Sequence, residues 1–240
     1  MDAAERLLDD WLARAAIDPS VFELRPDYCA GLMAVGGLRS GPTDPASDLA
    51  LSDAEQLVRG GHTMPESDHQ VELWREAYRS FGAKPKRTRP SVDALRRRAG
   101  RDGLPRVNRL TDHYNAVSVI SGVPIGVEDI DRYDGALRLT RAHGTETFLT
   151  TDHGEPVTEI VDAGEPIWRD DVGATCRRWN WRQTTRTALR DGTARAIFIV
   201  DALGADAQDT ALAVLRQLEE TLVGDLPAST RLIQRDGASD

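Results

Sequence analysis

The stretch from Tyr114 to Val127 contains no charged residue, although 29% of the chain is charged. Its pattern predicts a helix over residues 108–121 that ends at Gly122 and leads through a proline turn into an aspartate. Asn115 and Ser118 recur at helical spacing and share a small-polar face, beside an apolar face. A helix with one apolar and one uncharged polar face has neither face in bulk water. The polar face therefore belongs either to a satisfied core or to a pocket for a small polar ligand.

Elsewhere the hydrophobic pattern interleaves helices and strands without a βαβ repeat. Helices are predicted over residues 1–16, 52–59, 68–80, 91–99, 108–121 and 207–223. Strands are predicted over residues 21–24, 32–35, 136–142, 146–151, 156–161, 165–170, 172–179, 195–203 and 230–234. A loop is expected at 40–50, and hairpin turns at His153-Gly154 and Asp191-Gly192. This order indicates an α+β fold with mixed or antiparallel sheets and packed helices.

The length and composition describe one ordinary folded unit. A chain of 240 residues with 40% hydrophobic residues is long enough to bury a core. We expect residues 1–66 to add a helix, strands and a loop to the same unit as residues 67–240, giving one compact domain. No run of residues approaches the length of a membrane span, and the acidic N-terminus does not resemble a leader peptide. A cytoplasmic protein that does not bind membranes is expected.

The sequence lacks the common signatures of cofactor and nucleophile chemistry. It has no Gly-rich phosphate loop, no Gly-x-Ser-x-Gly elbow and no His-Glu-x-x-His pair. Cys29 and Cys176 make neither a disulfide framework nor a metal signature, and the five histidines have no ligand spacing. We expect neither a metal ion nor another cofactor.

A basic segment lies between Lys84 and Arg109, where ten basic residues stand against two acidic ones in a chain of net charge −9. Such a patch on an acidic body can bind phosphates locally. The alternative is a solvated helix whose cations pair with acidic neighbours. The candidate nucleic-acid contacts are Lys84, Lys86, Arg87, Arg96, Arg97 and Arg101.

Residues 112–129 also carry a family pattern. The matching positions, without a gap, are Asp112, Asn115, Val117, Gly122, Pro124 and Asp129. The pattern resembles the editing region, called the B3/B4 domain, of the phenylalanyl-tRNA synthetase β-subunit. The likeness extends over roughly residues 70–205, and the freestanding version of the domain is the closer match. The residues that resemble the signature of this freestanding domain are Trp74, Tyr78, Phe81-Gly82, Lys84, Pro90-Ser91, Leu104-Pro105 and Trp179-Asn180-Trp181-Arg182.

The resemblance implies a B3/B4-like fold and the hydrolysis, in trans, of a wrong or non-standard amino acid from tRNA. The partners would be the aminoacylated 3′ end of a tRNA and its amino-acid moiety. An aminoacyl ester is already activated, so a held water and oxyanion donors can suffice. The residues implied to act in catalysis are Tyr114, Asn115 and Ser118. Those implied to bind substrate are Pro124, Gly126, Glu128, Asn180, Trp181 and Arg182.

Two positions depart from the synthetase pattern. Gly126 stands where that pattern has a histidine, and Glu128 stands where it has a phenylalanine. The pocket is therefore rebuilt, and specificity for tyrosine does not carry over. A non-catalytic module that binds tRNA or an amino-acid-like ligand is the alternative function. A hydrolase acting on a small amino-acid ester or amide, without RNA, is a third.

The tetrapeptide Trp179-Asn180-Trp181-Arg182 is interpreted as part of a strand. The two tryptophans would then face one side, with Asn180 and Arg182 on the other. Asn180 and Arg182 would bind a carboxylate, a phosphate or a ribose, or a tryptophan would stack on the terminal base. In the alternative, both tryptophans belong to the core and Arg182 is a surface cation.

Overall fold

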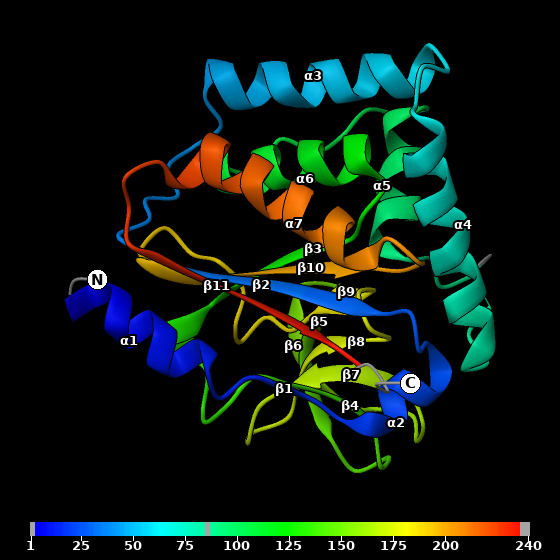
Figure 1. The fold of residues 1–240 in the computed structure, drawn as a ribbon, viewed down its shortest axis with the longest axis vertical. Helices are drawn as coiled ribbons and strands as arrows, with labels where there is room; N and C mark the ends of the chain where they lie inside the picture. Colours follow the sequence, from blue (N-terminus) through cyan, green and yellow to red (C-terminus); the bar gives the residue numbers. More distant parts are fainter. Residues whose placement is uncertain (1–2, 85–86, 236–240) are drawn as a thin grey trace.

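A four-stranded antiparallel sheet divides the molecule into two layers (Figure 1). The computed structural model describes residues 3–84 and 87–235. The strands of this sheet, in the order β11-β2-β10-β3, are β11 (Ala228–Gln234), β2 (Cys29–Gly36), β10 (Arg195–Ala202) and β3 (Ile125–Asp129). Every residue of β2 is buried, as expected of a strand covered on both faces. Because β2 pairs with β10 and β11, the N-terminal part of the chain is joined to the C-terminal part.

A second sheet lies below the first in Figure 1. Its order is β1-β4-β7-β8-β9, with β1 and β4 parallel and the other pairs antiparallel. Its strands are β1 (Ala16–Ile17), β4 (Arg138–Arg141), β7 (Pro166–Arg169), β8 (Ala174–Arg177) and β9 (Arg182–Gln183). A separate hairpin joins β5 (Thr147–Asp152) to β6 (Glu155–Ile160). These sheets confirm the predicted α+β fold with mixed and antiparallel pairing.

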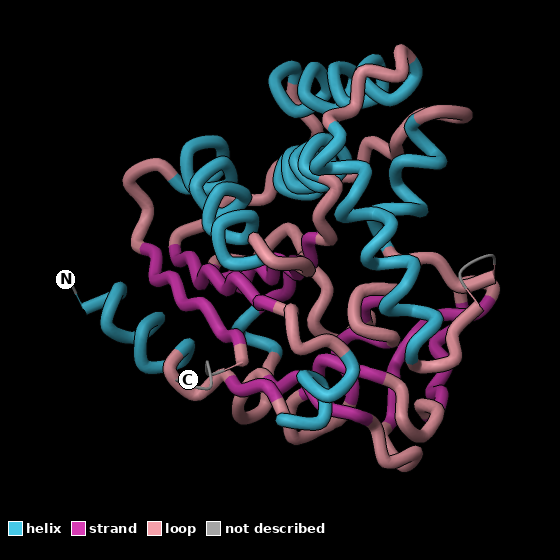
Figure 2. The backbone as a smooth tube through the Cα atoms, turned by 45° about the vertical axis from the view of Figure 1, so that its right-hand side comes forward, coloured by secondary structure: helices cyan, strands magenta, loops and turns pink. Residues whose placement is uncertain are grey.

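Helices cover the upper face of the four-stranded sheet, and Figure 2 shows the same layering from a turned view. They are α3 (Pro45–Arg59), α5 (Ser91–Ala99), α6 (Arg109–Ser121) and α7 (Ala207–Leu218), the last extended by a π-helical turn over Glu219–Val223. α4 (Pro65–Ser80) runs down the side of both layers in Figure 1. The remaining helical elements are α1 (Ala3–Leu12), α2 (Pro19–Leu24) and the short turn Ile130–Arg132.

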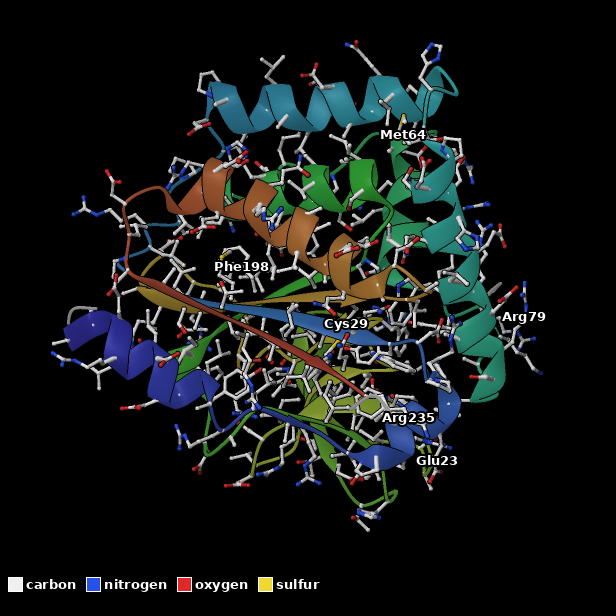
Figure 3. All side chains as sticks on the ribbon, viewed as in Figure 1. Glu23, Cys29, Met64, Arg79, Phe198 and Arg235 are labelled. Atoms are coloured by element: carbon white, nitrogen blue, oxygen red, sulfur yellow. The ribbon has the colours of Figure 1, made fainter. Side chains whose placement is uncertain are left out.

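Alternate side chains of β10 belong to two separate hydrophobic cores. Phe198 and Val200 point to the helical layer and pack with residues of α7, and Figure 3 shows Phe198 on that side. Ile197 and Ile199 point to the other face and pack with Trp74 of α4 and the second sheet. The sheet therefore has a helix-covered face and a face turned toward the second sheet.

Several predicted elements are corrected by the structure. The predicted strand at 21–24 lies in α2, because the Asp18 side chain accepts the Ser20 backbone N–H and Pro19 opens the helix. The predicted loop at 40–50 is helical from Pro45, where Asp44 and Ser47 form a capping box.

One unpredicted strand and one turn also differ from the sequence predictions. The proline turn after Gly122 continues into strand β3. Asp191-Gly192 joins β9 to β10, which lie in different sheets, so it is not a hairpin turn. His153-Gly154 does form the turn of the β5–β6 hairpin, as predicted.

Candidate functional site

A cavity of about 290 Å³ lies at β3, the edge strand of the four-stranded sheet. Residues of α5 and α6 border it on one side, and the segment from β8 to β9 borders it on the other. Predicted site residues that line it are Tyr114, Asn115, Gly126, Glu128, Asn180, Trp181 and Arg182. The other lining residues are Ser91, Ala94, Leu95, Ile125, Trp168, Cys176, Trp179, Gln183, Ile199 and Asp201. Its walls are mainly apolar and aromatic, with a few polar groups, as is typical of small-ligand sites.

The floor of the cavity follows from the register of β3 against β10. Gly126 pairs with Ile199, and both line the cavity. Because side chains alternate along a strand, Glu128 lies on the same face as Gly126, and Asp201 on the same face as Ile199. Gly126 has no side chain, so the space between Glu128 and Asp201 stays open. A Cβ at Gly126 would meet only the Gln183 Nε2, at 3.1 Å.

The opposite wall is a tight turn between β8 and β9, in place of the predicted strand. Arg178 and Trp179 have φ values of 48° and 69°, a left-handed conformation that costs non-glycine residues free energy. The turn directs Trp179 into the core, where it packs edge-on against Tyr28 and Trp74. Asn180 follows at the cavity wall. The alternation predicted for this tetrapeptide is therefore wrong.

Asn115 brings an amide from the polar face of α6 to the cavity. The residue is 8% exposed, and its side chain forms no hydrogen bond with any residue in the described part of the chain. Tyr114 lies beside it, and burial raises the pKa of its phenol. An amide offers both a donor and an acceptor, so Asn115 is free to bind a ligand through either.

Glu128 is fully buried, and only one of its two carboxyl oxygens has hydrogen-bond partners among the described residues. Its Oε2 accepts hydrogen bonds from the Tyr133 and Thr187 hydroxyls, each at 2.6 Å. Its Oε1 has no partner among the residues that the structure describes. Burial raises the pKa of this carboxyl above its usual value.

Asp201 is the second buried carboxyl at the cavity. It accepts hydrogen bonds from the Tyr28 hydroxyl at 2.6 Å and from the Asn180 amide at 3.3 Å. The Tyr78 hydroxyl in turn donates to the Asn180 Oδ1 at 3.0 Å. The Trp168 indole N–H faces the Asp201 carboxyl without reaching hydrogen-bond geometry. Burial raises the pKa of Asp201 to about 7, so this group titrates near neutral pH.

Unpaired polar atoms gather at this cavity. Within residues 3–84 and 87–235, the buried side-chain atoms without a partner are Ser91 Oγ, Glu128 Oε1, Thr140 Oγ1, Trp168 Nε1 and Trp179 Nε1. All of these residues except Thr140 line the cavity. Buried polar groups are normally satisfied, so a cluster of unsatisfied ones marks a place where a ligand or water would complete the bonding.

Comparison with known families agrees with this arrangement. Residues 73–212 match the family model of the B3/4 domain. The chain belongs to the B3/4 domain family. The match includes every residue that lines the cavity and confirms the resemblance inferred from residues 112–129.

One solved structure similar to this B3/4 chain is an N-terminal fragment of the phenylalanyl-tRNA synthetase β-subunit from Pyrococcus horikoshii. The two are 13% identical with a TM-score of 0.41, and the alignment covers 93% of this chain and 52% of the other. The chain therefore spans about half the length of that fragment. No curated protein matches the chain in sequence.

Two predicted site residues of the B3/4 chain lie away from the cavity. The Ser118 hydroxyl is fully buried and donates to the Val123 carbonyl at 2.7 Å, which ties the end of α6 to the following turn. The Pro124 carbonyl accepts the Asp201 backbone N–H at 3.0 Å. Both residues therefore support the backbone of the site and are not among the residues that line the cavity.

The predicted nucleic-acid face is also revised. Arg96 is buried, and its guanidinium donates to Val119, Ser67 and Asp68, so it holds α4, α5 and α6 together. Lys86 lies outside the described residues. The exposed cations of the set that pair with no described acid are Lys84, Arg87, Arg97 and Arg101.

Sequence reasoning missed several residues at the cavity, above all Asp201 and Trp168. Asp201 does leave a signal in the sequence, because it ends an otherwise apolar run, Ile197 to Val200, within a buried strand. A single acid in such a run is costly unless it is paired or functional. Trp168 and Ile199 give no comparable signal, because their patterns are those of ordinary core residues.

The described part of the chain shows neither a metal cluster nor a membrane helix. No three His, Cys, Asp or Glu side chains in it are arranged to hold a metal ion. None of its helices is long and apolar enough to cross a membrane.

Proposed function

We propose that this B3/4 chain acts in trans on the aminoacylated 3′ end of tRNA and hydrolyses the ester of a mischarged or non-standard amino acid. The observation that carries the proposal is the cavity at β3, where groups without hydrogen-bond partners surround a space of about 290 Å³. The likeness of residues 112–129 to the editing region supplies the substrate class.

Hydrolysis of an aminoacyl ester requires few catalytic groups, because the ester is already activated. Burial raises the pKa of the Cys176 thiol well above its usual value, so Cys176 is not a thiolate nucleophile. The attacking group is then a water molecule. Asn115, whose amide has no partner among the described residues, holds the ester and donates to the developing oxyanion.

The four exposed cations Lys84, Arg87, Arg97 and Arg101 are the proposed contacts for the tRNA backbone. Charge reversal at Arg97 or Arg101 should weaken tRNA binding, and wild-type binding should fall steeply with salt. Arg216→Glu, an exposed arginine on α7, is the matched control. Equal binding by all three variants would remove this surface from the proposal. Filter-binding titrations at two salt concentrations give the measurement.

Ligand binding without hydrolysis is the second candidate. It is favoured by the burial of Cys176 and Tyr114, which leaves the cavity without an activated nucleophile among its described residues. The two candidates separate in one assay. The protein is incubated with a panel of mischarged tRNAs, and the release of amino acid is measured over time for the wild type and Asn115→Ala. Release that depends on Asn115 supports the deacylase, whereas protection of the ester supports the binding module.

A further inference from the structure

The buried carboxylates of the molecule fall into three groups by partner. Those paired with an arginine are Glu55, Asp93, Glu146, Glu165 and Asp170. Asp112 and Asp129 instead accept backbone N–H groups. Glu128 and Asp201 have neither kind of partner within the described residues and receive only neutral side-chain donors.

The cations around the cavity do not relieve this imbalance, because Arg182, which lines it, pairs with Glu159 at 3.5 Å. Arg186 favours the charged form of Glu128 from a distance, but its guanidinium is bonded to Asp170, at 2.7 and 2.8 Å. Asp201 has no ion pair with any residue of the described chain. A buried carboxylate without a countercharge is costly, and it becomes favourable when a cation is brought to it. Both uncompensated carboxyls line the same cavity.

The register fixes how far apart the backbone positions of these two residues lie. Glu128 pairs with Ile197 across β3 and β10, and Asp201 lies four residues further along β10. Four residues of strand span about 14 Å. Gly126 and Ile199 form the floor between them, so a ligand lying across this floor has one carboxyl at each end.

The two ends differ in their surroundings. Trp168 and Trp179 line the cavity near Asp201, whereas hydroxyls of Tyr133 and Thr187 surround Glu128. Indole rings pack well against methylene groups, and the Asp201 carboxyl accepts hydrogen bonds from an ammonium. The Asp201 end therefore suits an ammonium carried on an aliphatic chain.

We infer that the cavity takes the aminoacyl ester of a basic amino acid, lysine or ornithine in class, with its side-chain ammonium at Asp201 and its α-ammonium at Glu128. Forming the ester removes the negative charge of the α-carboxylate. Such a ligand then carries two positive charges and no negative one, which matches the two carboxylates. The ester part of this inference rests on the proposed function.

The first experiment needs no variant. Calorimetry at pH 7 compares lysine methyl ester with norleucine methyl ester, which has the same carbon chain but no terminal ammonium. The lysine ester should bind at least tenfold more tightly. Equal affinity, tighter binding of the norleucine ester, or no binding of either would overturn the inference.

Variants then assign the two ends. Asp201→Asn should remove the preference for the lysine ester, and Glu128→Gln should weaken both esters by a similar factor, because both carry the α-ammonium. Asp129→Asn is the matched control, since Asp129 is buried on the same strand but is bonded to Thr193 and the Asp131 backbone. A preference that survives in Asp201→Asn would overturn the assignment of the ends.

Charged tRNA separates this inference from the proposed function. Hydrolysis of norleucyl-tRNA in preference to lysyl-tRNA would keep the deacylase and overturn the basic ligand. Binding of the lysine ester over the norleucine ester, without hydrolysis of any charged tRNA, would keep the basic ligand and overturn the deacylase.

Discussion

The two faces of the four-stranded sheet are built from the same alternating strands, yet their groups are satisfied to different degrees. On the helical face, Phe198 and Val200 pack among apolar residues, and the unpaired buried atom that the described helices contribute, Ser91 Oγ, lies at the cavity. On the other face, Glu128 and the two tryptophans Trp168 and Trp179 each carry an unpaired atom beside the cavity. The helical face contributes mainly to the stability of the fold, whereas the other face keeps unpaired polar groups that can bind a ligand.

The largest effect is expected on the helical face. Phe198→Ala removes a fully buried ring between β10 and α7 and should lower the free energy of unfolding by about 3–5 kcal/mol. Denaturant unfolding measures this loss. Affinity for the ligand, measured on the fraction that stays folded, should change little. A stability loss under about 1 kcal/mol would contradict the division between the two faces.

On the cavity face, Asp201→Asn should change how stability depends on pH. The folded-state pKa is raised to about 7 from an ordinary 3.8, so the folded protein holds this proton more tightly than the unfolded chain. This contribution is fully present below about pH 4 and is lost as the pH rises toward 7. The variant should therefore gain on the wild type by up to about 1.4 kcal/mol per pH unit in that window.

The control for this pH effect is Asp170→Asn. Burial opposes ionisation of Asp170, but hydrogen bonds from Arg186 and the Asp134 backbone hold the pKa of this carboxyl below its usual value. Its contribution is present above the unfolded-state pKa and is lost as the pH falls, so the sign of the slope reverses. Urea titrations that extend from pH 8 to below pH 4 provide both curves, because the Asp170 contribution changes only below its unfolded-state pKa. The same slope in both variants would show that the effect is not specific to the cavity.

Asn115→Ala and Ser118→Ala test the comparison within a single helix. Asn115 ends at the cavity, and its loss should lower activity or affinity by tenfold or more, with little change in stability. Ser118 is bonded to Val123, so its loss should cost about 1 kcal/mol of stability and leave activity unchanged. Equal loss of activity in the two variants, measured beside their thermal unfolding, would return Ser118 to the catalytic set.

The smallest effect is expected at Gly126. Gly126→His places a ring on the cavity floor, where the first neighbour to yield is the flexible end of Gln183. Activity on the preferred aminoacyl-tRNA should fall severalfold, while activity on Tyr-tRNA is retained or rises. If the wild type already prefers Tyr-tRNA and the variant keeps that preference, Gly126 does not set specificity.

The sequence was most informative where local signals and burial agree. The helix at 108–121, which is uncharged from Tyr114 onward, and its stop at Gly122 are found as predicted, with Gly122 in a left-handed conformation at φ 75°. The apolar strands of the four-stranded sheet, β2 and β10, were also found, because alternation and continuous burial leave few other arrangements.

What the sequence did not reveal depends on contacts between distant segments. The left-handed turn at Arg178 and Trp179 contains no glycine, so the sequence predicts a strand for Trp179-Asn180-Trp181-Arg182. Asp201 reaches the cavity only because β10 pairs with β3. Arg96 was predicted to face nucleic acid, but the packing of α5 against α6 buries it.

The cavity is assembled from two parts, and both belong to the framework of the fold. Its floor, Gly126 and Ile199, lies on paired strands. Its wall at residues 178–182 is a short connection, but Trp179 packs against Tyr28 and Trp74, and the Asn180 amide donates to Asp201. Ligand preference and folding are therefore coupled in this wall, so a substitution there alters both at once.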